Sequence, residues 1–129
     1  MKKIITPKDV HRPFGYSHAL QVDNTLYISG QIPLDMDMQV VGKGDMAAQT
    51  ELVYENLKKV LEEAGGTMES IVMMNIYVTD LDAFDRETRD LRKKYFGSYY
   101  PAVTAVEVRR LYNPDYLIEI EAVAVLDGK

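Results

Sequence analysis

The sequence predicts a single α+β domain in which two helices cover one face of one sheet. Stretches with strand-like alternation and stretches with helical spacing follow one another as about three strands, a helix, a strand, a helix and two strands. This order is typical of α+β proteins that carry their helices on one side of a sheet. The 129 residues, 47% hydrophobic and 27% charged, fit one globular domain over 1–129 with its own core.

Two helices are predicted from apolar residues that recur at helical spacing. The first begins at Asp45, which is a suitable N-cap, and ends at the glycine pair 65–66. Its apolar positions fall on one face, and Glu and Lys residues occupy the opposite face. The second predicted helix covers 81–97 and ends at Gly97.

Strands are predicted where apolar residues alternate with others between turn signals. The first stretch is interpreted as a hairpin that turns at Asp23 and Asn24. The predicted strand segments are 18–30, which holds this hairpin, 70–80, 102–108 and 117–126.

The last predicted strand is partly apolar on both of its faces. One side carries Ile118, Ile120, Ala122 and Ala124, and the other carries Leu117, Glu119, Glu121, Val123 and Val125. Because the helices can cover only one face of the sheet, the second face would be an exposed apolar patch unless another chain covers it. We therefore expect an oligomer that packs through its sheet.

Composition excludes several classes of function. The chain has no cysteine, and His11 and His18 are its only histidines, so we expect neither a thiolate nor a histidine-based metal site. The net charge of -5 disfavours nucleic acid as a partner. The N-terminal residues lack the apolar run of a signal peptide, and no stretch is long enough to span a membrane, so we expect a cytoplasmic protein.

Two glutamates of the last strand are candidates for chemistry. Glu119 and Glu121 project from the same face about 7 Å apart. In a semi-apolar setting each carboxylate either has a partner or has a raised pKa. Either residue could act as a general acid or base or could orient water. The alternative is a structural glutamate bound to backbone or to an arginine, and the sequence does not choose between the two residues.

Residues near the first hairpin suggest a ligand site. Ser17 and His18 do not form a catalytic pair, because neighbouring strand residues point to opposite faces. Tyr16 is the better ligand contact, since it combines an apolar ring with a hydroxyl group. Ser29 and Gly30 end a strand, where a glycine lets a ligand approach backbone N–H groups; a plain turn is the alternative.

Several motifs together resemble the RidA/YjgF family, also called endoribonuclease L-PSP. They are "YSHAL", "LYISGQIPLD", "YFGSYYPAVTAVEV" and "IEIEAVAV", and the resemblance extends from about residue 14 to 126. It implies a chorismate-mutase-like fold with a single mixed sheet, and a homotrimer with sheets packed inward and clefts between subunits. It also implies hydrolysis of enamines and imines such as 2-aminoacrylate without a cofactor or metal.

The resemblance assigns roles to individual residues. Glu119 would position the attacking water, and Tyr16, Ser29 and Gly30 would line the cleft. The family motif Pro-Ala-Arg-Ser/Thr places an arginine where this chain has Val103. In relatives that arginine grips the substrate carboxylate through two hydrogen bonds, which valine cannot make. Efficient hydrolysis of 2-aminoacrylate is therefore not expected to transfer to this chain.

Two functional hypotheses follow. The first is a Rid-family hydrolase that deaminates a small imine, enamine or related nitrogen compound, with Glu119 as the catalytic residue. The second is a non-catalytic trimer that binds a small metabolite or a protein. Ribonuclease activity is disfavoured, because the chain is acidic and has no basic groove in its sequence pattern.

Overall fold

The computed structural model describes residues 2–127, which form one six-stranded sheet covered by helices. The strands are β1 (Lys2–Ile5), β2 (Ala19–Val22), β3 (Thr25–Gln31), β4 (Ile71–Val78), β5 (Ala102–Glu107) and β6 (Ile118–Val125). The helices are α1 (Met46–Glu63), α2 (Leu81–Glu87), α3 (Arg89–Phe96) and the short 3₁₀ helix η1 (Met68–Ser70).

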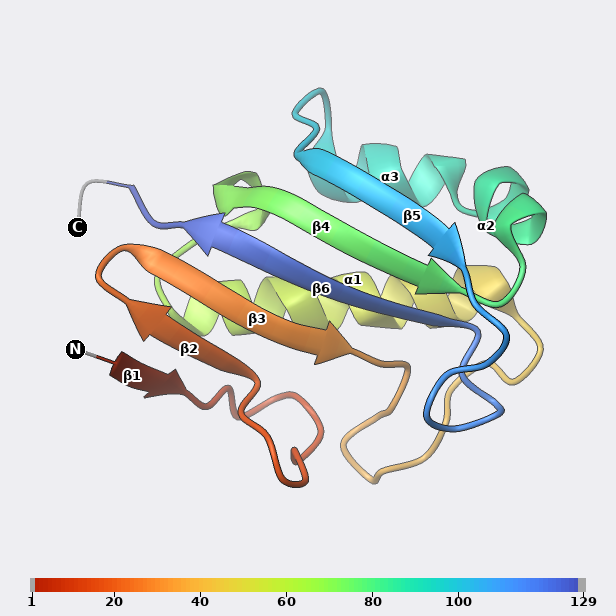
Figure 1. The fold of residues 1–129 in the computed structure, drawn as a ribbon, viewed down its shortest axis with the longest axis horizontal. Helices are drawn as coiled ribbons and strands as arrows, with labels where there is room; N and C mark the ends of the chain where they lie inside the picture. The colour runs from red at the N-terminus through yellow and green to blue at the C-terminus, as the bar shows by residue number, and fades with distance from the viewer. Residues whose placement is uncertain (1, 128–129) are drawn as a thin grey trace.

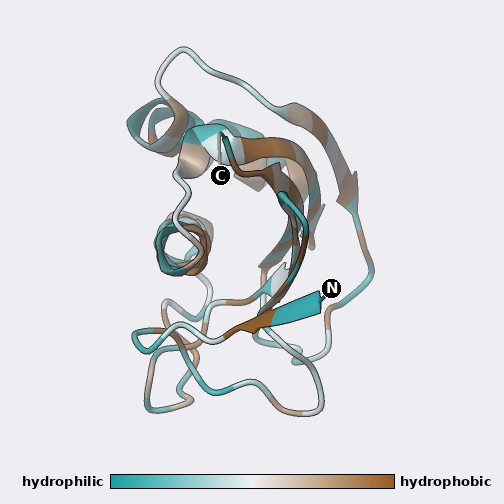
Figure 2. Ribbon diagram, turned by 90° about the vertical axis from the view of Figure 1, so that its left-hand side faces the viewer, coloured by the Kyte–Doolittle hydropathy of each residue, from teal (hydrophilic) through white to brown (hydrophobic). Residues whose placement is uncertain are grey.

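The sheet is mixed, and its order is β1-β2-β3-β6-β4-β5 (Figure 1). Only β4 and β5 run parallel, and the other neighbours are antiparallel. The α-helices lie on one side of the curved sheet (Figure 2). The predicted α+β class, single sheet and one-sided helices are therefore confirmed. None of the helices among residues 2–127 is long and apolar enough to cross a bilayer.

Strand β6 follows the predicted alternation. Ile118, Ile120, Ala122 and Ala124 are buried under the helices, whereas the residues between them are only partly buried. The same alternation continues in β4, where Met74, Ile76 and Val78 are buried. The core therefore lies between one face of the sheet and α1, and the opposite face, which we call the open face, carries no helix (Figure 2).

Helix α1 has the predicted boundaries. The Asp45 side chain accepts a hydrogen bond from the Ala48 N–H at 3.1 Å, which makes it the N-cap. At the other end Gly65 has φ +86°, a conformation that favours glycine and stops the helix. Val53, Leu57 and other apolar residues of its inner face are fully buried against the sheet.

The second predicted helix is divided into α2 and α3 at Thr88. The Thr88 hydroxyl donates to the Phe84 carbonyl at 2.6 Å, and Thr88 has φ -122°, outside the helical range. A threonine that bonds back to the carbonyl four residues earlier often bends a helix. Three α-helices therefore stand where the sequence pattern predicted two, on the same face of the sheet.

A buried glutamine ties α1 to the loop that leads into β6. The Gln49 side chain donates to the Gly42 carbonyl at 3.2 Å and to the Asp115 carbonyl at 2.9 Å, and accepts from the Leu117 N–H at 2.7 Å. Gln49 is fully buried, so these backbone groups have little access to water. Its amide therefore fixes where β6 begins.

We expect Gln49→Leu to lower the free energy of unfolding by about 2–4 kcal/mol, because it removes three hydrogen bonds and leaves buried backbone groups unpaired. Urea titration followed by circular dichroism would measure this loss. Gln39→Leu is the matched control, since Gln39 is exposed and its amide contacts only a nearby loop carbonyl; it should change stability by less than about 0.5 kcal/mol. Equal effects of the two substitutions would contradict the role given to Gln49.

Candidate functional site

A cleft of about 590 Å³ opens where β3 and β6 meet the loops that precede β2 and β6. Tyr16, Ser29, Gly30 and Glu119, which the sequence analysis selected, all line this cleft. Strand β6 supplies Glu119, the end of β3 supplies Ser29 and Gly30, and the loop before β2 supplies Tyr16. The fold thus brings together residues that lie about 100 positions apart in the sequence.

Gly30 allows the Glu119 side chain to lie directly against the β3 backbone. A Cβ atom added to Gly30 would lie 1.9 Å from Glu119 Oε2, which no real contact tolerates. The pairing of β3 with β6 shifts register between Ile28 and Gln31, so Gly30 sits in an irregular part of the strand. Glycine at this position therefore leaves space for the carboxylate that faces it.

Electrostatics set Glu119 apart from ordinary surface glutamates. Burial raises the pKa of the Glu119 carboxyl group, and the nearby Glu121 carboxylate raises it further. Within residues 2–127, no side chain or backbone group donates a hydrogen bond to this carboxylate, and no cation pairs with it. The group is therefore half-buried, destabilised in its charged form and available to a ligand or to water.

Two tyrosines, Tyr16 and Tyr116, line the cleft together with Glu119. Burial and, to a smaller extent, the Glu119 carboxylate raise the pKa of Tyr16. Tyr116 also lines the cleft, and burial together with Tyr16 and Glu119 raises its pKa. Both hydroxyl groups therefore stay protonated near neutral pH, and each can donate one hydrogen bond.

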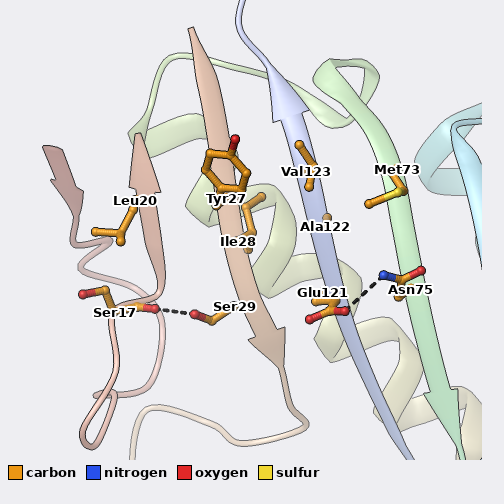
Figure 3. A pocket seen from close by; sticks show the side chains of 10 residues that line it. All are labelled: Ser17, Leu20, Tyr27, Ile28, Ser29, Met73, Asn75, Glu121, Ala122 and Val123. Carbon is orange, nitrogen blue, oxygen red and sulfur yellow. Dashed lines mark hydrogen bonds between the residues drawn. The ribbon is translucent and has the colours of Figure 1, made fainter. Parts of the chain in front are cut away.

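Glu121, the other candidate, has partners within the chain. Its Oε2 atom accepts from the Tyr77 hydroxyl at 2.8 Å and from Asn75 Nδ2 at 3.1 Å. It lines a separate pocket of about 380 Å³ on the open face, with Tyr27 and Met73 nearby (Figure 3). These two donors fit the structural interpretation of Glu121.

The third acidic residue of the closing strands is also accounted for by the fold. Glu107 accepts a hydrogen bond from the Leu81 N–H at 2.9 Å. It therefore stabilises the first turn of α2, where a negative charge is favourable.

Within one chain Val103 does not line the cleft. It lies on β5, pairs with Met74 of β4 and is 48% exposed at the edge of the sheet. Strand β4 separates β5 from β6, so β5 does not border the Glu119 cleft within one chain. Of the five residues predicted to form the site, four are therefore together and Val103 is apart.

His11, which no sequence pattern indicated as a site residue, lines the cleft and is 2% exposed. His11 Nε2 lies 3.3 Å from the Tyr16 hydroxyl. Burial, together with the nearby His18, lowers the pKa of His11 to about 4, so its ring is neutral at pH 7. The neutral ring can accept a hydrogen bond from the Tyr16 hydroxyl, and this bond would fix the orientation of the phenol beside Glu119. A lone histidine in a loop carries no sequence signal for this contact.

His18 has a structural role. Its Nε2 atom donates to the His11 carbonyl at 2.7 Å, and its Nδ1 atom accepts from Gln31 Nε2 at 3.2 Å. The Ser29 hydroxyl donates to the Ser17 carbonyl at 2.6 Å beside this pair (Figure 3). These contacts hold the loop before β2 against β3. In the described part of the chain no three His, Cys, Asp or Glu residues gather in a way that could hold a metal ion.

The pKa of His11 predicts acid sensitivity. The unfolded chain binds a proton at His11 below its ordinary pKa of 6.5, whereas the folded chain binds it only near pH 4. Protonation therefore favours the unfolded state as the pH falls through this window, and by pH 4 about 3 kcal/mol of stability is lost.

His11→Gln removes this titration. As the pH falls from 7 to 4, the free energy of unfolding should therefore decrease more in the wild type than in the variant. Urea titrations at pH 7, 5.5 and 4 would show this divergence. Parallel pH profiles of the two proteins would mean that His11 titrates normally in the folded state.

Comparisons with known proteins place the chain in a family. The family described as Endoribonuclease L-PSP matches residues 9–126. A RutC family protein of Pyrococcus abyssi is 41% identical over 124 residues, which cover 95% of this chain and 96% of that protein. A 2-iminobutanoate/2-iminopropanoate deaminase of Dermatophagoides farinae is 32% identical over 127 residues and 98% of each chain.

Solved structures share the fold. The Rid family protein YyfA of Yersinia pestis superposes with a TM-score of 0.90 at 35% identity, covering 98% of this chain and 100% of that one. TdcF of E. coli, solved with bound serine, gives a TM-score of 0.84 at 29% identity and covers 95% of this chain and 98% of its own. The sequence match and these structures together show that the chain belongs to the RidA/YjgF family, the endoribonuclease L-PSP family.

Proposed function

We propose that this protein hydrolyses a small imine or enamine, releasing ammonia, at the cleft that contains Glu119. The observation that supports this most directly is the Glu119 carboxylate, which lies half-buried against the Gly30 backbone with a raised pKa and without a partner in the described chain. A carboxyl group whose pKa is moved toward neutrality is suited to exchange protons with water and substrate. The name of the deaminase relative from Dermatophagoides farinae agrees with this chemistry.

The proposed reaction adds water across a carbon–nitrogen double bond. Glu119 accepts a proton from a water molecule as the water oxygen bonds to the imine carbon, and it passes this proton to the nitrogen to give a tetrahedral carbinolamine. The hydroxyl proton of the carbinolamine then moves to the nitrogen as the carbon–nitrogen bond breaks, which releases ammonia and a carbonyl compound. In this scheme Tyr16 lines the substrate and the Gly30 N–H stabilises developing charge, because the Ser29 N–H already donates to the His18 carbonyl at 2.9 Å.

Val103 bears on the choice of substrate. Relatives have an arginine at this position, and it makes two charge-assisted hydrogen bonds to the substrate carboxylate. This contact contributes roughly 1.5–3 kcal/mol to substrate binding. We therefore propose that the chain is a poor 2-aminoacrylate deaminase and acts on a different imine. The same substitution favours the second candidate function, a non-catalytic module that binds a metabolite or protein in this cleft.

A homotrimer is part of this proposal. The open face exposes large apolar side chains, among them Tyr27, Met73, Val106 and Val125. Patches of this kind on a single chain usually mark an interface. Packing three copies through their open faces would cover these residues and would allow β5 of one copy, with Val103, to approach the cleft of another.

Replacing Glu119 tests the catalytic role. An amino-acid oxidase generates imines in solution, and semicarbazide traps those that are not hydrolysed first. Wild-type protein should suppress semicarbazone formation with at least one imine, and Glu119→Gln should reduce that rate by about 100-fold or more. Glu62→Gln on the exposed side of α1 is the matched control and should keep full activity. Wild-type protein that suppresses no imine in a broad panel would instead support the binding module.

Light scattering tests the trimer. A mass of about three times 14.7 kDa is expected at micromolar concentration. Val125→Glu should dissociate the assembly, because it places a charge on the open face. Leu81→Glu, which adds the same charge on helix α2, should leave the mass unchanged. A monomeric wild type would contradict the packing through the sheet.

A further inference from the structure

Among the described residues of one chain that line the cleft, one is a cation and one is an anion. Arg12 is the cation and Glu119 the anion, while His11 is neutral at pH 7. All the other lining residues are uncharged. A ligand that carries a carboxylate near one end and a nitrogen at the reacting carbon would complement both charges.

Arg12 is available to a ligand. Its guanidinium carbon lies 5.0 Å from the centroid of the Phe14 ring, a cation–π contact that orients the group. No carboxylate lies within 4.0 Å of it in the stretch from residue 2 to residue 127. A guanidinium stacked on a ring keeps its N–H edges free, and these edges match the two oxygens of a carboxylate.

Aromatic side chains surround the rest of the cleft. Phe14, Tyr16, Tyr112 and Tyr116 line it, and aliphatic residues form the remaining wall. Phe14 is 63% exposed and Tyr112 is 93% exposed, so each has an apolar ring face that a bound group could cover. A cleft of about 590 Å³ is larger than a three-carbon imine requires and leaves room for a bulky side chain.

We propose that Arg12 holds the carboxylate of the 2-imino acid or 2-keto acid in this cleft, and that the cleft prefers ligands with an aromatic or large apolar side chain. Arg12 would thus supply, from the loop before β2, a charge that Val103 cannot provide. The side chain of the ligand would pack against the exposed rings of Phe14 and Tyr112, and its reacting carbon would face Glu119. The imine part of this assignment rests on the proposed function; the ligand class and the role of Arg12 can be tested by binding alone.

Stable 2-keto acids, the products of the proposed reaction, serve as probes. Titration calorimetry should show that phenylpyruvate binds wild-type protein at least 10-fold more tightly than pyruvate, because only the former covers the aromatic wall. Arg12→Gln should weaken phenylpyruvate binding by roughly 10- to 100-fold. Phenylacetone, which has the ring but lacks the carboxylate, should bind both proteins equally.

Arg86→Gln is the matched control, because Arg86 is exposed on helix α2 and does not line the cleft; it should bind phenylpyruvate like the wild type. Circular dichroism would verify that both variants are folded. Equal affinities for pyruvate and phenylpyruvate, no binding of either, or an Arg12→Gln variant with wild-type affinity would each overturn the proposal. Tight, Arg12-dependent binding without imine hydrolysis would support it and would contradict only the catalytic function.

Discussion

The position of β6 at the centre of the sheet constrains the rest of the molecule. It pairs with β3 on one side and β4 on the other, and its alternate residues, such as Ile118 and Ile120, fill the core under α1. A shift of one residue would turn Glu119 and Glu121 into that core, where unpaired charges are costly. Core packing therefore fixes the register, and the register alone places both glutamates on the open face.

Neighbouring strands then give the two glutamates different chemistry. Asn75 and Tyr77 of β4 donate to Glu121, so its charge is compensated inside the chain. Glu119 instead faces the backbone of Gly30, which has no side chain, and accepts no hydrogen bond from it. The raised pKa of Glu119 is the consequence of burial without compensation. The hydrogen-bonding of the two carboxylates thus depends on which groups of β3 and β4 face two neighbouring outward positions of β6.

Much of this arrangement follows from sequence, but not all of it. The alternation in β6 and the capping residues of α1 are local patterns, so they predict faces and boundaries directly. The residues themselves suggested a small-ligand site near Tyr16, Gly30 and Glu119, and the resemblance to the family assigned a role to each of them. The break at Thr88 depends on one side-chain hydrogen bond, and the contact of His11 with Tyr16 depends on tertiary packing. Neither has a periodic signal that sequence analysis could detect.

The compensation of Glu121 also bears on how the open face could be covered. Burying an unpaired carboxylate at an interface between subunits would cost several kcal/mol. Glu121 lies among Tyr27, Met73 and Val123 in the pocket of the open face, and its two donors reduce that cost (Figure 3). Glu119 has no such donors, but it lines the other cleft, where a ligand or water can reach it. Glu121, which has hydrogen-bond donors, can therefore be buried at an interface, whereas Glu119, which has none among the described residues, stays accessible in its cleft. The proposed trimer, with clefts at its subunit boundaries, requires this difference.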